Sequence, residues 1–135
     1  MGRRSRPSVI VLDTHAWLWW CDASKRLSRS AGVEIERAAT IGVSAMSCWE
    51  LVMLERQHRL QFDRGVAAWI RQGLSRDRTV MLPITSDIAM RGGAIHAHVP
   101  DPADALIYAT AIEHGAQLVS RDQRLHDLDP ARLVW

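Results

Sequence analysis

The chain has 135 residues, of which 47% are hydrophobic and 24% are charged, values that suit one globular domain and argue against disorder. Its formal net charge is +2, but without Arg3, Arg4 and Arg6 the remaining chain has 14 basic and 15 acidic residues. The composition alone therefore does not indicate a strongly basic nucleic-acid binder. Because the longest apolar run covers only residues 16–21 and no secretory signal pattern is present, we expect a cytoplasmic protein without membrane contact.

The first half of the chain alternates strand and helix patterns. In chain order these predict a flexible basic tail at residues 1–7 and then, within a domain at residues 8–135, a strand at 9–12, helices at 14–21 and 28–39, a strand at 41–45 and a helix at 47–57. Residues 9–12 are apolar throughout, which is typical of a strand buried on both faces of a parallel sheet. Ser47 is the expected N-cap of its helix, because Glu50 follows it at capping-box spacing.

The second half continues the alternation. In chain order we expect a helix that opens at Asp63, a strand at 79–84, helices at 86–95 and 102–114, a strand at 117–120, a short helix at 123–128 and a possible fifth strand at 131–135. The helix at 102–114 has the clearest signals, with Asp101 as N-cap, Pro102 in its first turn and Gly115 as its stop. The alternation predicts an α/β fold in which helices flank a small parallel sheet of four or five strands.

Three acidic residues stand where a parallel sheet places its ligand site, beyond the carboxyl ends of the strands. Asp13 directly follows the first strand, Asp122 comes two residues after the fourth, and Asp104 lies in the first turn of the helix at 102–114. Each acid has a structural alternative, because a carboxylate also caps a helix or favours the positive end of the helix dipole.

Glu50 strengthens the case for a site, because its neighbours at 48–54 are nearly all apolar. It is either the capping partner of Ser47 or a metal ligand, since a carboxylate among core residues is costly unless it is paired or coordinated. No Lys or Arg lies between Arg37 and Arg56 to pair with it locally. Four gathered carboxylates would repel one another, and a hard divalent cation with oxygen ligands, Mg²⁺ or Mn²⁺, resolves that repulsion.

Four sequence blocks carry a family resemblance. They are VLDTHAWLW at 11–19, SCWEL at 47–51, DPADALIYATA at 101–111 and LVSRD at 118–122. In order and spacing they resemble the motif blocks of PIN-domain ribonucleases, above all the VapC-like toxins of bacterial toxin–antitoxin pairs. The resemblance implies Mg²⁺-dependent RNA cleavage, a homodimer and inhibition by a cognate antitoxin, with acidic-site roles for Asp13, Glu50, Asp104 and Asp122. The chain departs from many relatives at Ala105, where they carry Arg, and at Ser120, where they carry Thr.

Further residues are candidates for substrate contact. They are Arg121, Ser120 and Thr14, all next to or near a site acid. His15 could orient the substrate but is more simply a residue of the first helical turn, and His96 and His98 are more simply solvated than metal-binding. Trp17, Trp19, Trp20, Trp49 and Trp69 could stack on bases, but a core or dimer face explains most of them.

The sequence thus predicts a metal-dependent endoribonuclease that hydrolyses RNA phosphodiester bonds, and it leaves open which RNA is cleaved and whether one or two metals act. The alternative is an inert PIN-like scaffold that only binds a partner. A haloacid-dehalogenase-type phosphatase is excluded, because His15 stands where that chemistry needs a second Asp. A receiver domain is excluded because Lys25, the only Lys, does not follow the last strand.

Overall fold

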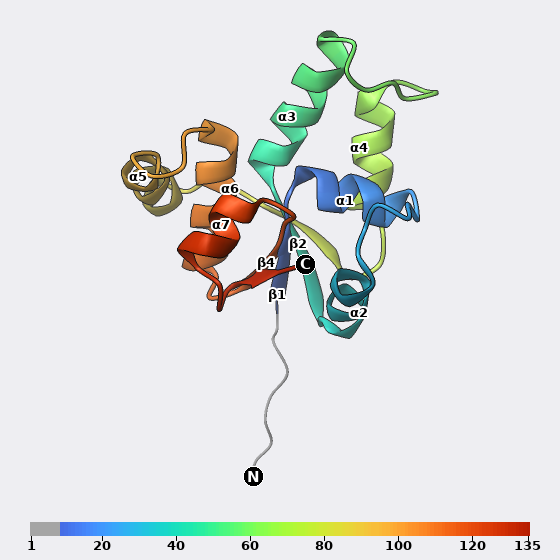
Figure 1. The fold of residues 1–135 in the computed structure, drawn as a ribbon. Helices are drawn as coiled ribbons and strands as arrows, with labels where there is room; N and C mark the ends of the chain where they lie inside the picture. The colour runs from blue at the N-terminus through green and yellow to red at the C-terminus, as the bar shows by residue number, and fades with distance from the viewer. Residues whose placement is uncertain (1–8) are drawn as a thin grey trace.

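Five short parallel strands form the centre of the computed structural model, which describes residues 9–135 (Figure 1). The expected tail at residues 1–7 lies outside the described residues. The strands are β1 (Val9–Leu12), β2 (Thr40–Ser44), β3 (Thr79–Leu82), β4 (Gln117–Val119) and β5 (Leu133–Val134). Their order across the sheet is β3-β2-β1-β4-β5, and every neighbouring pair is parallel. The predicted α/β architecture is confirmed, with all five expected strands present.

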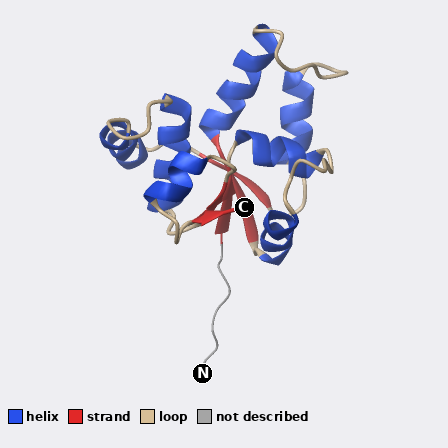
Figure 2. Ribbon diagram, viewed as in Figure 1, coloured by secondary structure: helices blue, strands red, loops and turns tan. Residues whose placement is uncertain are grey.

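Helices cover both faces of the sheet (Figure 2). They are α1 (Thr14–Cys21), α2 (Arg29–Arg37), α3 (Ala45–Arg56), α4 (Val66–Leu74), α5 (Ser86–Ile95), α6 (Pro102–Glu113) and α7 (Gln123–Leu128). Side chains alternate across a strand, so Ile10 and Leu12 pack with α1 and α2 while Val11 packs on the opposite face with α6. Among residues 9–135, no helix is both long and apolar enough to cross a bilayer.

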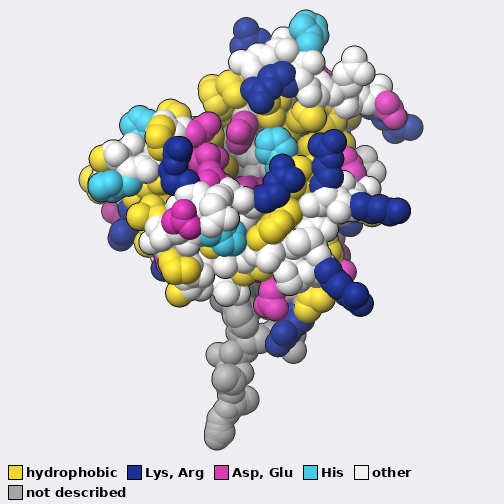
Figure 3. Space-filling view, viewed as in Figure 1, with side chains coloured by type: hydrophobic (Ala, Val, Ile, Leu, Met, Phe, Trp, Pro, Cys, Tyr) yellow, Lys and Arg dark blue, Asp and Glu magenta, His cyan; other side chains and the backbone are white. Residues whose placement is uncertain are grey.

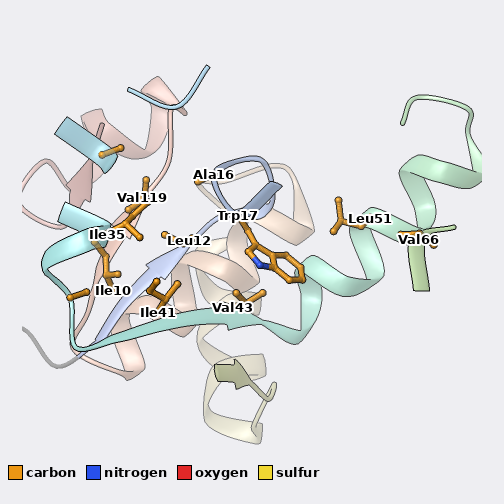
Figure 4. Close-up of a cluster of buried hydrophobic side chains, with 12 residues drawn as sticks. Ile10, Leu12, Ala16, Trp17, Ile35, Ile41, Val43, Leu51, Val66 and Val119 are labelled. Atoms are coloured by element: carbon orange, nitrogen blue, oxygen red, sulfur yellow. The ribbon is translucent and has the colours of Figure 1, made fainter. Parts of the chain in front are cut away.

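Trp17 is the largest fully buried side chain on the α1 face of the sheet, with 1% of its surface exposed (Figure 4). Its ring meets the edge of Trp69 from α4, with 4.9 Å between centroids and 68° between planes. Gly73 permits this approach, because a Cβ there would lie 3.0 Å from Cζ2 of Trp17. Trp17 therefore belongs to the core and is not available to bases, whereas Trp69 is partly buried and packs against it.

The start of α3 differs from the prediction. Ser44 caps the helix, accepting a hydrogen bond from the amide of Met46 at 3.1 Å, so the helix begins two residues before Ser47. Ser47 is fully buried in the first turn, where its hydroxyl lies 2.9 Å from that of Thr14. The capping-box interpretation of Ser47 is wrong, because the tertiary contact with α1 takes its hydroxyl, and Glu50 is free of any capping role.

The start of α4 also differs. The helix begins at Val66, whereas Asp63 is exposed in the preceding turn. The first amide of the helix donates to Oε2 of Glu55 at 3.0 Å, so a carboxylate of α3 satisfies it. Local sequence did not reveal this start because its capping group lies 11 residues away in the chain.

The carboxyl edge of the sheet gathers the starts of four helices (Figure 1). Strands β1, β2 and β4 lead directly into α1, α3 and α7, and α6 starts beside them, in contact with α3 and β1. The start of α6 matches the prediction, with Asp101 as N-cap and Pro102 in the first turn. Four N-terminal helix ends thus face the region where the sequence places its acidic residues.

Candidate active site

One pocket collects the acidic residues at the carboxyl edge of the sheet. It measures about 410 Å³, within the usual size range of small-ligand sites. Its carboxylates are Asp13, Glu50, Asp101, Asp104 and Asp122. In Figure 3 acidic side chains surround a hollow on the face in view, with basic and histidine side chains at its border. All four predicted acids therefore share one pocket. Asp101 lines it too, although its position before Pro102 favoured a capping role over a place in the acidic cluster.

Asp13 and Asp122 combine a capping role with a place in the pocket. Oδ1 of Asp13 accepts from the amide of Ala16 at 2.8 Å, and Oδ1 of Asp122 accepts from the amide of Arg124 at 2.8 Å. A carboxylate has two oxygens, so each cap leaves Oδ2 available. The cap fixes the orientation of the carboxylate, and the structural and functional interpretations of these acids are compatible.

At the start of α6, Asp101 caps the helix and Asp104 supplies a carboxylate to the pocket. Oδ1 of Asp101 accepts from the amide of Asp104 at 3.1 Å and caps the helix. The Asp104 carboxylate has no hydrogen-bond partner within residues 9–135, and it is half-buried in the pocket. Asp104 is therefore the acid least committed to holding the fold.

Glu50 enters the pocket from the second turn of α3. Its Oε1 lies 2.5 Å from the Thr14 hydroxyl, which is buried with 2% of the residue exposed. The hydroxyl in turn contacts Ser47, so residues of α1 and α3 together hold the carboxylate. Glu50 thus has a hydrogen bond that orients it, but within the described residues no cation that neutralises it.

The electrostatics of the pocket are strongly unfavourable to negative charge. Burial, together with the charges of the other four carboxylates, raises the pKa of Asp104 to about 7. Burial also raises the pKa values of Asp13 and Glu50, although hydrogen bonds from Ser120 and Ala16 to Asp13 and from Thr14 to Glu50 offset part of the effect. Among residues 9–135, none of the five pocket carboxylates forms a salt bridge. The pocket therefore favours a proton or an added cation.

The donor set fits a hard divalent cation in its chemistry, because every acidic ligand is a carboxylate oxygen and no cysteine lines the pocket. In the described part of the chain, no three His, Cys, Asp or Glu side chains are grouped closely enough to hold a metal ion as they stand. The carboxylates thus line one open pocket without forming a closed cluster.

The predicted substrate contacts differ in accessibility. Arg121 is exposed at the pocket, with its guanidinium carbon 4.9 Å from the centroid of the Trp19 ring. Thr14 and Ser120 are 2% and 1% exposed, which leaves their hydroxyls no surface for an RNA contact. The Ser120 hydroxyl accepts from the amide of Asp122 at 3.1 Å, so both buried hydroxyls contact site acids instead.

Several residues of the site had no clear signal in the sequence. Arg59 lines the pocket but lies outside every motif block, whereas Trp19, which also lines it, was already a candidate for stacking on bases. The ring of His126 lies 2.7 Å from the Ser120 carbonyl and holds the β4–α7 loop, a contact that only the folded chain shows. His96 is exposed outside the pocket and contacts the Val99 carbonyl at 3.0 Å, which fits the interpretation as a surface residue.

Comparisons with known proteins agree with the fold. A family model described as PIN domain matches residues 10–130. Ribonuclease VapC22 of Mycobacterium tuberculosis (strain ATCC 25618 / H37Rv) is 43% identical over 119 residues, which span 87% of this chain and 90% of that protein. A toxin–antitoxin complex from Klebsiella pneumoniae has a TM-score of 0.66 at 21% identity and covers 93% of this chain and 96% of its own. VapBC2 from Rickettsia felis, bound to a promoter DNA fragment, has a TM-score of 0.66 at 16% identity and covers 93% and 97%.

Proposed function

The chain belongs to the PIN-domain family, as its four motif blocks predicted, and on that premise we propose that it is a metal-dependent endoribonuclease, the toxin of a toxin–antitoxin pair. It hydrolyses RNA phosphodiester bonds in the cytoplasm with Asp13, Glu50, Asp104 and Asp122 as its acidic site. The fold and the relationship to a named ribonuclease support the reaction class. The observation that carries the proposal is the pocket of five carboxylates without salt bridges in the described chain.

The four site acids are the proposed ligands of Mg²⁺ or Mn²⁺. Asp13 and Asp104 are the central pair, and Glu50 and Asp122 complete the ligand set, in part through water. When bound, such a cation offsets charge on the phosphate and makes water a better nucleophile at neutral pH. The pKa of Asp104, raised to about 7, supports this assignment, because a group that resists ionisation in the free protein gains most from a cation beside it.

The other residues of the pocket position the acids and the substrate. Thr14 fixes Glu50, and Ser120 holds the amide of Asp122, so the buried hydroxyls act through the carboxylates. Arg59 and Arg121 are exposed at the pocket and supply positive charge toward the RNA backbone. The chain thus binds an anionic polymer at an acidic centre by placing bases at the border.

We also propose an antitoxin partner, VapB-like by analogy with the solved complex of VapBC2. The acidic pocket is open to solvent, and an Arg of an antitoxin segment placed near Asp13 and Asp104 would neutralise it. Such a contact would inhibit the enzyme by occupying the place of the cation. Co-purification with the product of the neighbouring reading frame, and rescue of growth by it, tests this partner.

A homodimer is the proposed assembly. Trp49 and Val52 lie on α3 with 58% and 40% of their surfaces exposed, an apolar face that a second copy could cover. Trp17 and Trp19 of α1 do not contribute to this face, because they are 1% and 7% exposed, whereas Trp20 is partly buried against the core. Light scattering at micromolar concentration checks the assembly, and a monomer would contradict it.

Cleavage of RNA in the presence and absence of metal tests the enzymatic proposal. We expect cleavage with Mg²⁺ or Mn²⁺, none in excess EDTA, and none by Asp104→Asn with the fold and assembly unchanged. Asp77→Asn is the matched control, because the Asp77 side chain is 97% exposed and lies outside the pocket. Full cleavage by Asp104→Asn, or cleavage in EDTA, would contradict the site. A chain that binds the antitoxin but does not bind Mn²⁺ would favour the alternative, an inert PIN-like scaffold that only binds a partner.

A further inference from the structure

Arg121 is held against an aromatic ring at the border of the acidic pocket. Its guanidinium carbon lies 4.9 Å from the centroid of the buried Trp19 ring. His15, one helical turn before Trp19, places its exposed ring 5.6 Å away at an angle of 47°. Trp135 supports Trp19 from another side at 5.9 Å. The buried Trp19 ring thus contacts two exposed planar groups, the guanidinium of Arg121 and the imidazole of His15.

No carboxylate pairs with Arg121 in the described part of the chain. Among residues 9–135 it has no salt bridge and no side-chain hydrogen bond, although the pocket beside it contains five carboxylates. Its loop is fixed on both sides, because the amide of Ser120 donates to the carbonyl of Val134 at 3.2 Å and Asp122 caps α7. The guanidinium is therefore placed by the backbone and the Trp19 ring instead of by a carboxylate.

We propose that Arg121 and His15, both supported by Trp19, form a stacking subsite for one unpaired nucleobase beside the scissile phosphate. One side of the guanidinium contacts Trp19, and because Arg121 is exposed the other side is open to solvent. Unpaired RNA bases stack on Arg planes and on aromatic rings, including His. This inference rests on the proposed ribonuclease function, and it requires an unpaired base at the site, because bases in a duplex already stack on one another.

Arg59 provides the comparison that separates stacking from simple charge. It is exposed and lines the same pocket, but within the described residues no aromatic ring lies beneath its guanidinium. Lys keeps the charge of Arg but has no plane on which a base can stack. Replacing Arg59 by Lys should preserve a phosphate contact, whereas the same change at Arg121 should remove the stacking surface.

The test measures RNA affinity in the Asp104→Asn background with Mg²⁺, in which no cleavage is expected. Fluorescence anisotropy follows a labelled single-stranded eight-nucleotide RNA, a series in which each base in turn is abasic, and the matching duplex. We expect Arg121→Lys to weaken binding about tenfold, His15→Ala about threefold and Arg59→Lys by less than either, whereas Arg29→Lys, at an exposed residue outside the pocket, leaves binding unchanged. An RNA that lacks the base at one particular position should bind the Asp104→Asn protein about tenfold more weakly than the intact RNA does. The same RNA should bind the protein that also carries Arg121→Lys as well as the intact RNA does.

The outcomes distinguish this inference from the function on which it rests. If the parent chain binds single-stranded RNA but Arg121→Lys binds equally well, Arg121 makes a phosphate contact or none, and the stacking subsite is wrong. Equal affinity for the duplex would overturn it as well. If the parent chain binds no RNA of either form, both the ribonuclease function and the subsite fail together.

Discussion

The hydroxyl of Thr14 donates a hydrogen bond to the carboxylate of Glu50 across 2.5 Å, although the two residues are 36 positions apart. A hydroxyl carries one proton, so with that proton committed to Glu50 the nearby Ser47 hydroxyl donates to Thr14. Both hydroxyls are buried, and water does not compete for them. The chain therefore orients one acid of the site through a relay that joins the first helix to the third.

The first prediction concerns this relay. Thr14→Val should weaken Mn²⁺ binding and lower RNA cleavage by about tenfold, because Glu50 loses the donor that orients it and Ser47 loses its acceptor. Thr14→Ser keeps the hydroxyl and should stay within about twofold of the parent chain. Mn²⁺ titration and cleavage rates check this pair, and equal Mn²⁺ affinity of the Val and Ser variants would exclude a positioning role.

The second prediction concerns pH in the metal-free protein. The pKa of Asp104 is raised to about 7 from its ordinary value of 3.8, so its ionisation opposes folding. Its stabilising contribution is complete below the unfolded pKa and is lost as the pH rises through about 7. In EDTA, Asp104→Asn should gain roughly 1–2 kcal/mol in unfolding free energy between pH 5 and pH 8 relative to the parent chain, a figure that allows for solvent screening of a half-buried group.

Urea unfolding at both pH values measures this difference. Asp77→Asn, on the exposed surface, should follow the parent chain across the same range. Saturating Mg²⁺ should reduce the advantage of Asp104→Asn, because a cation stabilises the ionised carboxylate in the parent chain alone. An Asp104→Asn variant whose stability parallels the parent at every pH contradicts the electrostatic account of the pocket.

The third prediction concerns the close approach of α4 to the core. Gly73→Ala should destabilise the fold by about 1–3 kcal/mol, because the added Cβ would lie 3.0 Å from the rigid, buried ring of Trp17. Gly32→Ala is the matched control in α2, where a Cβ meets no atom within 4 Å and should stabilise the helix by roughly 0.5–1 kcal/mol. Thermal unfolding of both variants checks the sign, and a stabilising Gly73→Ala would contradict this packing.

The fourth prediction concerns the contact that holds the C-terminal segment. Burial alone would raise the pKa of Asp129, but hydrogen bonds from Tyr108 at 2.8 Å and Arg132 at 3.0 Å outweigh it and lower the pKa. A lowered pKa gives stability above the unfolded value, which is lost as the pH falls through the folded one. Tyr108→Phe should therefore cost about 1 kcal/mol at pH 7 and progressively less in acid. A cost that is independent of pH would exclude Asp129 as the functional acceptor.

The sequence predicted the fold wherever a local pattern and the final packing agreed. The apolar strand at 9–12 and the helix beginning at Pro102 follow from residues that are neighbours in the chain. The starts of α3 and α4 did not follow, because Ser47 is taken by Thr14 and the first amide of α4 is satisfied by Glu55. Those contacts depend on where helices meet, which a single sequence does not show.

The site shows the same division. Asp13 and Asp122 were predictable because each directly follows or closely follows a strand, and the topology brings strand ends together. The place of Arg59 in the pocket was not predictable, because Arg59 follows α3 in a segment that carries no motif. Likewise, the sequence does not show that Thr14 and Ser120 are buried. Only the placed side chains show that these two residues contact the acids and are not exposed to a substrate.

The caps formed by Asp13 and Asp122 depend on a carboxylate oxygen and not on its charge. Asn presents the same oxygen to a helix amide but carries no charge, so exchange of a single atom group leaves the helix starts intact. Ala at either position removes the cap as well and weakens the fold. A single Asp→Asn exchange at either position therefore removes one negative charge from the pocket and leaves a well-folded chain, so the helix starts and the acidity of the pocket can change independently in evolution.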